Sequence, residues 1–330
     1  MQWSRKRSIA VVLFCLALFT LFLYVRRFGP IPTVQTLPAE GSLIAFYAVT
    51  FPSPFTREYG LFLVDIDTKR VLRWTSASSG VGGARIVWQE QSQQLFFSGI
   101  LGSRSGFYII STDGVIEQAP FFRQTDSFGH VLSHNGRYLA FSRMGNIYIH
   151  DLQSAEIRQI THDDAHNAPT HWSPDDQALV FSSAATGSEW LYIIHRIDLD
   201  GSNQISLTEN LEGSSSGARW SPDGTMIAFG VTSSRDAPRS LWIMDQDGNN
   251  ARQIVPPHHS GKRTRGVSAF AWSPDSRQIA FASGSDGFCY ITVGYAFECT
   301  ESIYLINIDG TGLKRLTHRW QIATSLTWVR

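Results

Sequence analysis

We predict an all-β fold, a six-bladed β-propeller, from a repeated motif, from its spacing and from the last residues of the chain. The tetrapeptide Trp-Ser-Pro-Asp occurs at 172–175, 220–223 and 272–275, and an apolar triplet that ends in Phe follows each copy. Large apolar residues in the position of the Trp recur 40 to 52 residues apart from Trp88 onward, near the length of a propeller blade. The Phe occurs six times, which indicates six units, at Phe46, Phe97, Phe141, Phe181, Phe229 and Phe281.

Each unit is expected to form four short antiparallel strands. In the fifth unit, a strand that ends at Trp220 is followed by a Ser-Pro-Asp-Gly turn and by the strand 227–229. The strand 241–244 and an Asp-Gly turn come next, and a strand such as 315–317 of the sixth unit completes the set. Because strand direction alternates, the turns lie on one face of the propeller, and the variable segments and blade connections lie on the other.

The C-terminus is expected to close the ring. A single blade cannot bury both of its faces, so the first and last blades must pack against each other. Residues 325–330, Ser-Leu-Thr-Trp-Val-Arg, are a seventh copy of the innermost strand with no turn after it. The first unit, which begins with the strand 43–46, can accept this strand, although Leu37 competes for the same position. We therefore predict that the C-terminal strand completes blade 1.

The repeated elements Trp-Ser-Pro-Asp-Gly, Ile-Ala-Phe, Asp-Gly and Arg-x-Leu-Thr resemble the TolB-type, WD40-like propeller repeat over residues 37–330. The match is strongest in blades 4 to 6, because blades 1 to 3 carry other residues at the first turn. TolB also has an α/β domain before its propeller, whereas a membrane segment is expected in that place here. The resemblance therefore implies the propeller fold, and the Pal lipoprotein partner of TolB is not carried over.

Composition agrees with a large all-β domain and argues against a nucleic-acid partner. Hydrophobic residues make up 43% of the chain and aromatic residues 12%, against 17% charged residues. The formal net charge is +0, and neither half of the chain forms a basic stripe that could neutralise phosphates. We expect no cofactor.

The N-terminus is predicted to be a transmembrane anchor. Three basic residues at 5–7 precede the uncharged apolar run 9–25, which is just long enough to span a bilayer. The alternative is a cleaved signal peptide, but two arginines follow the run in place of a small-residue cleavage site. The excess of basic residues before the run places the propeller outside the cytoplasm. The predicted regions are a cytoplasmic segment 1–8, the anchor 9–25, a linker 26–36 and the propeller 37–330.

Cys289 and Cys299 lie in one insertion of blade 6, close enough in sequence to close a hairpin loop. Outside the cytoplasm such a pair is expected to be oxidised to a disulfide. Two free thiols are the alternative.

The loop face is where we expect function, because it is the face that varies between blades. The longest loops, in blades 1 and 6, become neighbours on ring closure and are rich in aromatic residues, which suits a protein contact surface. Alternatively, these rings pack on one another as a small core. A basic connection between blades 5 and 6 could hold a carboxylate or an acidic loop. The candidate partner-binding residues are Phe51, Phe55, Phe288, Tyr290, Tyr295, Phe297, His258, His259, Arg263 and Arg265.

Polar residues at the inner strand ends and at the connection between blades 3 and 4 are candidates for the rim and funnel of the propeller. Two His residues separated by three others, His162 and His166, can ligate zinc, but a loop does not hold the geometry that a helix would, and no third ligand is identifiable. We therefore expect a polar rim and no metal. The candidates are His130, His162, Asp163, His166, His171 and Arg219.

No catalytic constellation is identifiable in the sequence. The segment 213–217, Gly-Ser-Ser-Ser-Gly, fits the nucleophile-elbow formula but lies in a polar connection and not on a strand-to-helix turn. We expect a monomeric, single-pass membrane protein whose propeller is a non-catalytic platform for a protein of the cell envelope or a secreted protein. The alternatives are a lactonase-like or other hydrolytic enzyme, or a sensor of peptides or glycans, with its site in the central funnel.

Overall fold

The structure is a computed structural model of the 330-residue chain. It describes residues 31–39, 41–53, 56–77, 86–101, 104–119, 128–184, 190–257, 266–284, 289–291, 297–299, 301–317 and 323–329. Within these ranges there is no helix of the length and apolar character needed to cross a membrane. The anchor predicted at 9–25 lies outside the described residues.

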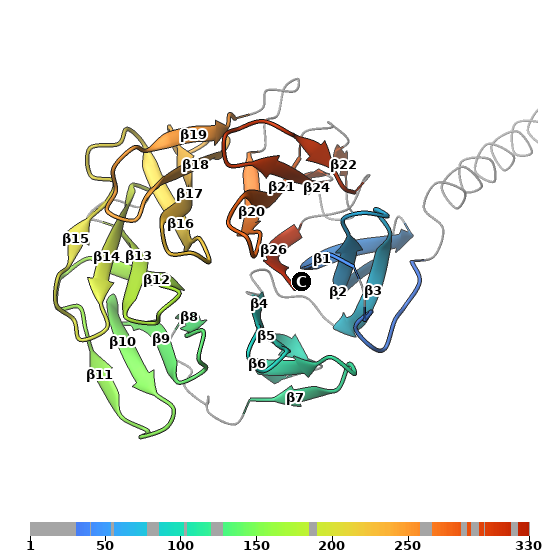
Figure 1. The fold of residues 1–330 in the computed structure, drawn as a ribbon, viewed down its shortest axis with the longest axis horizontal. Helices are drawn as coiled ribbons and strands as arrows, with labels where there is room; N and C mark the ends of the chain where they lie inside the picture. Colours follow the sequence, from blue (N-terminus) through green and yellow to red (C-terminus); the bar gives the residue numbers. More distant parts are fainter. Residues whose placement is uncertain are drawn as a thin grey trace, which may run out of the picture.

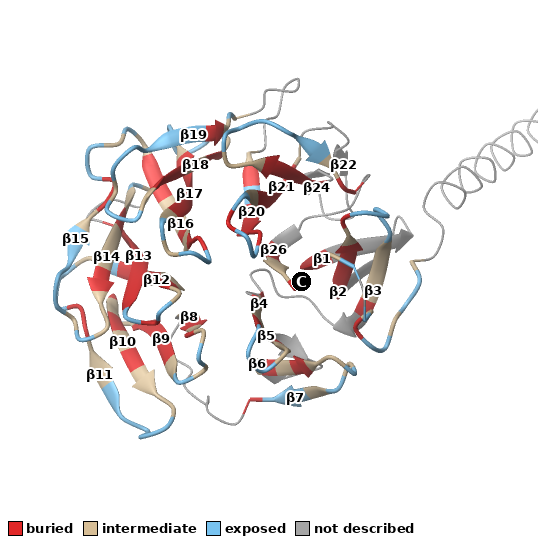
Figure 2. Cartoon of the chain, in the orientation of Figure 1, coloured by how far each residue is buried: buried red, intermediate tan, exposed pale blue. Residues whose placement is uncertain are grey.

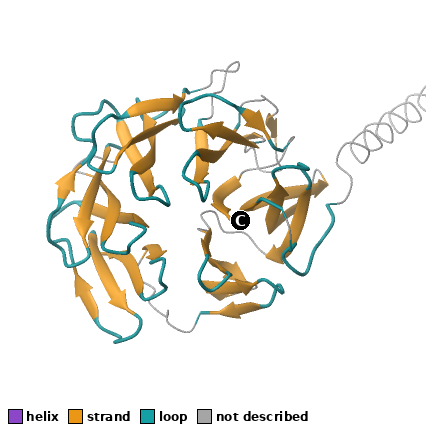
Figure 3. Cartoon of the chain, in the orientation of Figure 1, coloured by secondary structure: helices purple, strands orange, loops and turns teal. Residues whose placement is uncertain are grey.

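Six four-stranded antiparallel sheets stand around a common centre, as Figures 1 and 3 show. Blade 1 contains β26 (Ala323–Trp328), β1 (Leu43–Ser53), β2 (Thr56–Asp65) and β3 (Val71–Ala77). Blade 2 contains β4 (Ile86–Gln89), β5 (Gln94–Leu101), β6 (Arg104–Ser111) and β7 (Ile116–Gln118). Blade 3 contains β8 (Phe128–Leu132), β9 (Tyr138–Arg143), β10 (Asn146–Asp151) and β11 (Ile157–Gln159).

The second half of the ring has the same design with one addition. Blade 4 contains β12 (His166–Trp172), β13 (Ala178–Ala184), β14 (Tyr192–Asp198) and β15 (Ile205–Ser206). Blade 5 contains β16 (Ser214–Trp220), β17 (Met226–Thr232), β18 (Ser240–Asp245) and β19 (Arg252–Val255). Blade 6 contains β20 (Val267–Trp272), β21 (Gln278–Ser283), β24 (Ser302–Asn307) and β25 (Lys314–Arg315), with the hairpin β22 (Cys289–Ile291) and β23 (Phe297–Cys299) inserted.

The predicted ring closure is confirmed. Strand β26 pairs with β1, with Leu326 opposite Phe46, and the amide of Val329 donates to the carbonyl of Leu43 at 2.8 Å. Leu37, which competed for this place in the sequence, is buried within a cluster that includes blade 2 residues such as Phe97. The innermost strand of blade 1 therefore comes from the far end of the chain.

The repeated Phe residues form the core of the blades. All six have at most 3% of their surface exposed. In five blades the ring stacks on an aromatic or imidazole ring of the third strand, for example Phe46 on Phe62 with centroids 5.5 Å apart. Figure 2 shows that burial is greatest in the inner and middle strands and least in the outermost strands, such as β7 and β15. Face-to-face packing of adjacent blades thus provides the apolar core.

The Trp-Ser-Pro-Asp motif is a self-contained turn. In blade 5 the Ser221 hydroxyl donates to the Asp223 carboxylate at 2.6 Å and accepts the Met226 amide at 2.9 Å. The same two bonds recur in blades 4 and 6. Blade 3 has Ser-His-Asn-Gly instead, yet Ser133 makes the corresponding bond to Asn135 at 2.8 Å. The repeated residues are therefore explained by the geometry of the turn.

Candidate functional site: the central channel and a groove on the turn face

A cavity of about 240 Å³ lies at the centre of the ring. Every inner strand, β4, β8, β12, β16, β20 and β26, contributes residues to its wall. The wall contains the aromatic ring of Phe270, short polar side chains such as Thr170, and two arginines, Arg219 and Arg239. The cavity is therefore the central channel of the propeller, and its wall combines cationic, aromatic and hydroxyl groups.

Bulges in the inner strands direct residues toward this channel. The pairing register shifts in five of the six inner strands, β8, β12, β16, β20 and β26. In β12 Thr170 is the extra residue between the paired residues Pro169 and His171, and in β20 Ser268 is the extra residue between Val267 and Ala269. Gly129 and Gly217, at equivalent positions of β8 and β16, both have a φ of 68°, which a glycine adopts readily. Bulges commonly re-aim side chains next to binding sites, and here the extra residues line the channel.

The two arginines both lie near the ring of one aromatic residue, Phe270. Arg219 donates from Nη1 to the carbonyl of Leu326 at 2.9 Å, so it connects blade 5 with the closing strand. Arg239 donates from Nη2 to the carbonyl of Ser216 at 2.6 Å. Each guanidinium carbon is 5.7 Å from the centre of the Phe270 ring, within the range of a cation–π contact.

Three of the predicted rim and funnel residues, His130, His171 and Arg219, come together in the channel wall. The other three, His162, Asp163 and His166, are exposed and do not line the channel. Asp163 accepts bonds from the Asn167 side chain and the Ala165 amide, so its visible role is to shape its own loop. In the part of the chain that the structure describes, no three His, Cys, Asp or Glu side chains gather as a metal site would require.

Arg239 was not among the predicted site residues, because it lies immediately before the third strand of blade 5, far in sequence from the inner strands. One residue of the sequence, Gly230, does indicate that another group comes close to its own strand. This residue follows the repeated Phe, and the corresponding residues of the neighbouring blades are Ser182 and Ala282. A glycine in the middle of a strand marks a close approach, and here the group that approaches is Arg239.

All ten of the predicted partner-binding residues lie where the structure describes no side chain. Cys289 and Cys299 stand directly opposite each other in the hairpin β22–β23. Phe51, Tyr290 and Phe297 lie on described strands but their side chains are not described, and the remaining residues fall outside the described ranges, namely Phe55, Phe288, Tyr295, His258, His259, Arg263 and Arg265.

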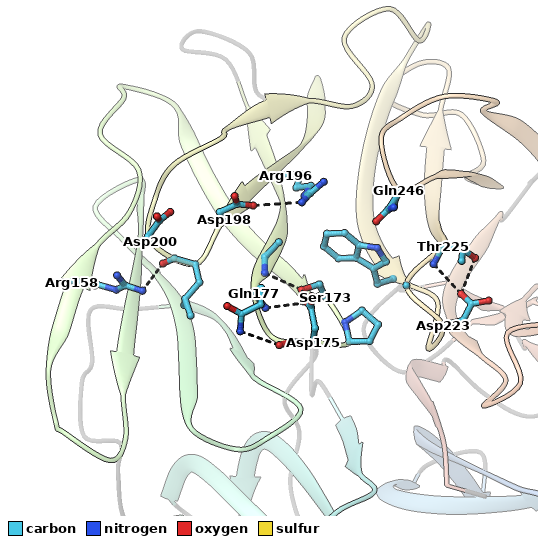
Figure 4. A pocket seen from close by; sticks show the side chains of 15 residues that line it. Arg158, Ser173, Asp175, Gln177, Arg196, Asp198, Asp200, Asp223, Thr225 and Gln246 are labelled. Carbon is cyan, nitrogen blue, oxygen red and sulfur yellow. Dashed lines mark hydrogen bonds and ion pairs between the residues drawn. The ribbon is translucent and has the colours of Figure 1, made fainter.

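A second, larger cavity of about 660 Å³ lies on the turn face between blades 4 and 5 (Figure 4). Its polar wall includes Arg196, which is 3.5 Å from the Asp198 carboxylate and 5.9 Å from the Trp220 ring. The repeated Trp residues differ here. Trp172 and Trp272 donate from the indole to a carbonyl of the preceding blade at 3.0 Å, whereas the buried Trp220 nitrogen has no acceptor among the described residues. This cavity, a groove between blades 4 and 5, thus lies at the junction where the indole of the repeated Trp has no acceptor among the described residues.

Comparison with known proteins places this geometry in a family. The PD40 family, described as the TolB beta propeller domain, matches residues 105–292. Two similar solved structures are TolB from Acinetobacter baumannii (18% identity, TM-score 0.64, 93% of this chain and 70% of that chain) and a putative TolB from Agrobacterium tumefaciens (18% identity, TM-score 0.60, 86% and 92%). An oligogalacturonate lyase in complex with manganese is also similar in fold (16% identity, TM-score 0.50, 85% and 74%).

Among curated proteins, the uncharacterized protein Atu1656 of Agrobacterium fabrum is 25% identical over 193 residues, which cover 54% of this chain and 61% of that protein. The match thus spans less than two thirds of that relative's length. Because the family match covers more than half of the chain, the chain belongs to the TolB β-propeller domain family.

Proposed function

We propose that this chain is a membrane-anchored propeller outside the cytoplasm that acts as a non-catalytic binding platform for another protein. The partner binds at the loop-face end of the central channel. The observation that carries this proposal is the set of bulges, which bring residues of five inner strands into a wall with Arg219, Arg239 and Phe270. Aromatic and arginine side chains are the groups most enriched at the energetic centres of protein interfaces.

Two further features belong to this proposal. The aromatic loop residues of blades 1 and 6 would extend the contact surface beyond the channel. The direct pairing of Cys289 with Cys299 favours a disulfide, because antiparallel neighbours have Cα atoms about 4.5–5.5 Å apart, and a disulfide bridges Cα atoms about 4.4–6.8 Å apart. A disulfide here would stiffen the blade 6 insertion. Mass measurement after alkylation without reductant tests it, since an oxidised pair takes up no alkylating reagent.

Photocrosslinking in intact cells tests the platform. A photoreactive residue at Thr170, in the channel wall, is compared with one at Gln246, an exposed residue on the turn face. We expect one protein to be captured in good yield from position 170 and not from position 246. Capture from position 246 alone, or from neither position, would refute the proposal.

The alternative functions, an enzyme or a sensor of peptides or glycans, would use the same channel. The two arginines on the channel wall favour a substrate or ligand that is acidic. Recovery of a small ligand from the purified protein, together with the absence of any crosslinked protein, would favour this alternative.

A further inference from the structure

Arg239 reaches the channel along a path of glycines. Its side chain runs from the edge of β18 across β17 and β16. A Cβ atom on Gly230 would lie 1.6 Å from Nε of Arg239, and one on Gly217 would lie 2.5 Å from Nη2. Both distances are far below any contact that real atoms make, so no other residue fits at either position while the arginine keeps this path.

The other blades provide an internal control for this path. Ser142 and Ser182 occupy the position of Gly230 in blades 3 and 4, and Ala282 occupies it in blade 6. At the position of Arg239 itself, blade 6 has Glu301, which is buried and accepts a bond from the Ser268 hydroxyl of the channel wall at 2.9 Å. The blade fold therefore does not require the glycine, and its presence in blade 5 accompanies the arginine.

The charge of Arg239 is not neutralised by any described carboxylate. Among the described residues its only hydrogen-bond acceptor is the Ser216 carbonyl, and the buried Nε has no acceptor there. Burial lowers the pKa of Arg239 to about 10, which still leaves it cationic at neutral pH. Nη1 has no acceptor within the described ranges and is not among the buried atoms that lack a partner, so it keeps some exposed surface, and the residue lines the cavity. Arg239 is half-buried as a residue, and a cation whose buried Nε lacks an acceptor is costly to hold unless an anion compensates it.

We propose that Arg239, with Arg219 beside it, binds a carboxylate group in the central channel. Two guanidinium groups at equal distances from the Phe270 ring form a cationic wall, and arginine binds the planar carboxylate through paired hydrogen bonds. A cavity of about 240 Å³ admits an acidic side chain, a chain terminus or a small organic acid. This inference rests on the channel being the binding site proposed above.

Titration calorimetry of the purified full chain in detergent tests the proposal. The probes are glutarate, a tripeptide with a free terminal carboxylate, the same tripeptide amidated, and inorganic phosphate. We expect the two carboxylate probes, or one of them, to bind and the amide to fail. Tighter binding of the peptide acid indicates a protein source, and tighter binding of glutarate indicates a small acid. Binding of phosphate alone, or of no carboxylate, would overturn the proposal.

Two variants test whether Arg239 is the residue that binds the carboxylate. Arg239→Met keeps the apolar stem and should weaken the carboxylate by about 10- to 100-fold, the loss expected for a charge-assisted hydrogen bond. Arg252→Met, a change at an exposed arginine of the same blade, is the matched control and should bind as the wild type. Equal affinity of Arg239→Met and the wild type would overturn the assignment.

Gly230→Ala provides a second test of the proposed site, in which Arg239 itself is not replaced. Its Cβ blocks the path, so this variant should also lose carboxylate binding, and Arg239→Ala in the same chain should relieve the clash and restore thermal stability. Retention of binding by Gly230→Ala would contradict the proposed path. If titration fails while crosslinking from position 170 still captures a protein, the carboxylate site is wrong and the platform stands.

Discussion

At the turn end of the inner strands in blades 4, 5 and 6, each Ser hydroxyl donates to the Asp carboxylate of its own turn and accepts the amide of the residue five positions later. Farther along the same strands, the register shifts and polar residues face the channel, where Arg239 has donors with no acceptor among the described residues. The first region is repeated and self-satisfied, and the second varies from blade to blade. This contrast indicates that the repeated residues are those that the ring needs in order to fold. The residues that differ from blade to blade lie where we expect a ligand to bind.

The largest effect should come from damage to the ring closure. Leu326 is fully buried in β26, so Leu326→Asp places a charge among apolar neighbours and should lower the free energy of unfolding by about 4 kcal/mol or more. Leu313→Asp is the control, because Leu313 is 62% exposed, and it should change stability by less than about 0.5 kcal/mol. Chemical denaturation measures both. Similar small effects would mean that the closing strand adds little to the stability of the ring.

A smaller effect on stability should distinguish the junctions between blades, where the repeated Trp residues lie. Trp172→Phe removes the indole bond to the Val131 carbonyl of the neighbouring blade. Trp220→Phe removes a donor that has no acceptor among the described residues. We therefore expect Trp172→Phe to cost about 1 kcal/mol more than Trp220→Phe in chemical denaturation. Trp272→Phe should behave like Trp172→Phe, since its indole is also bonded. Equal costs at all three positions would remove the distinction between the junctions.

The smallest effect concerns the pH dependence of the turns. The Ser173 hydroxyl holds the pKa of Asp175 below its usual value, and Ser273 does the same for Asp275. Because the folded-state pKa is below the unfolded value of about 3.9, the stabilisation is present above about pH 4 and is lost as the pH falls through the folded-state pKa. The stability difference between the wild type and Asp175→Asn should therefore shrink on going from pH 6 to pH 3. A difference that stays constant would contradict this origin.

Periodic features of the fold could be predicted from the sequence, because a Trp, a Ser-Pro-Asp turn and a buried Phe recur at blade length. The closure by residues 325–330 followed from the same repeat. The channel site was predicted only in part. His130, His171 and Arg219 lie in inner strands, so their place on the wall follows from the repeat. Arg239 precedes another strand, and its side chain reaches the channel across two neighbouring strands, which only the three-dimensional structure shows. The missing bond of Trp220 depends on a blade junction and has no local sequence signal.

The most direct test of the account combines the channel with its arginine. Crosslinking from position 170 is repeated in intact cells with Arg239→Met and with the control Arg252→Met. We predict that Arg239→Met lowers the yield of the captured protein by about tenfold, in line with the loss of one charge-assisted contact, while Arg252→Met leaves it unchanged. An unchanged yield with Arg239→Met would contradict the claim that the arginine in the channel binds the partner.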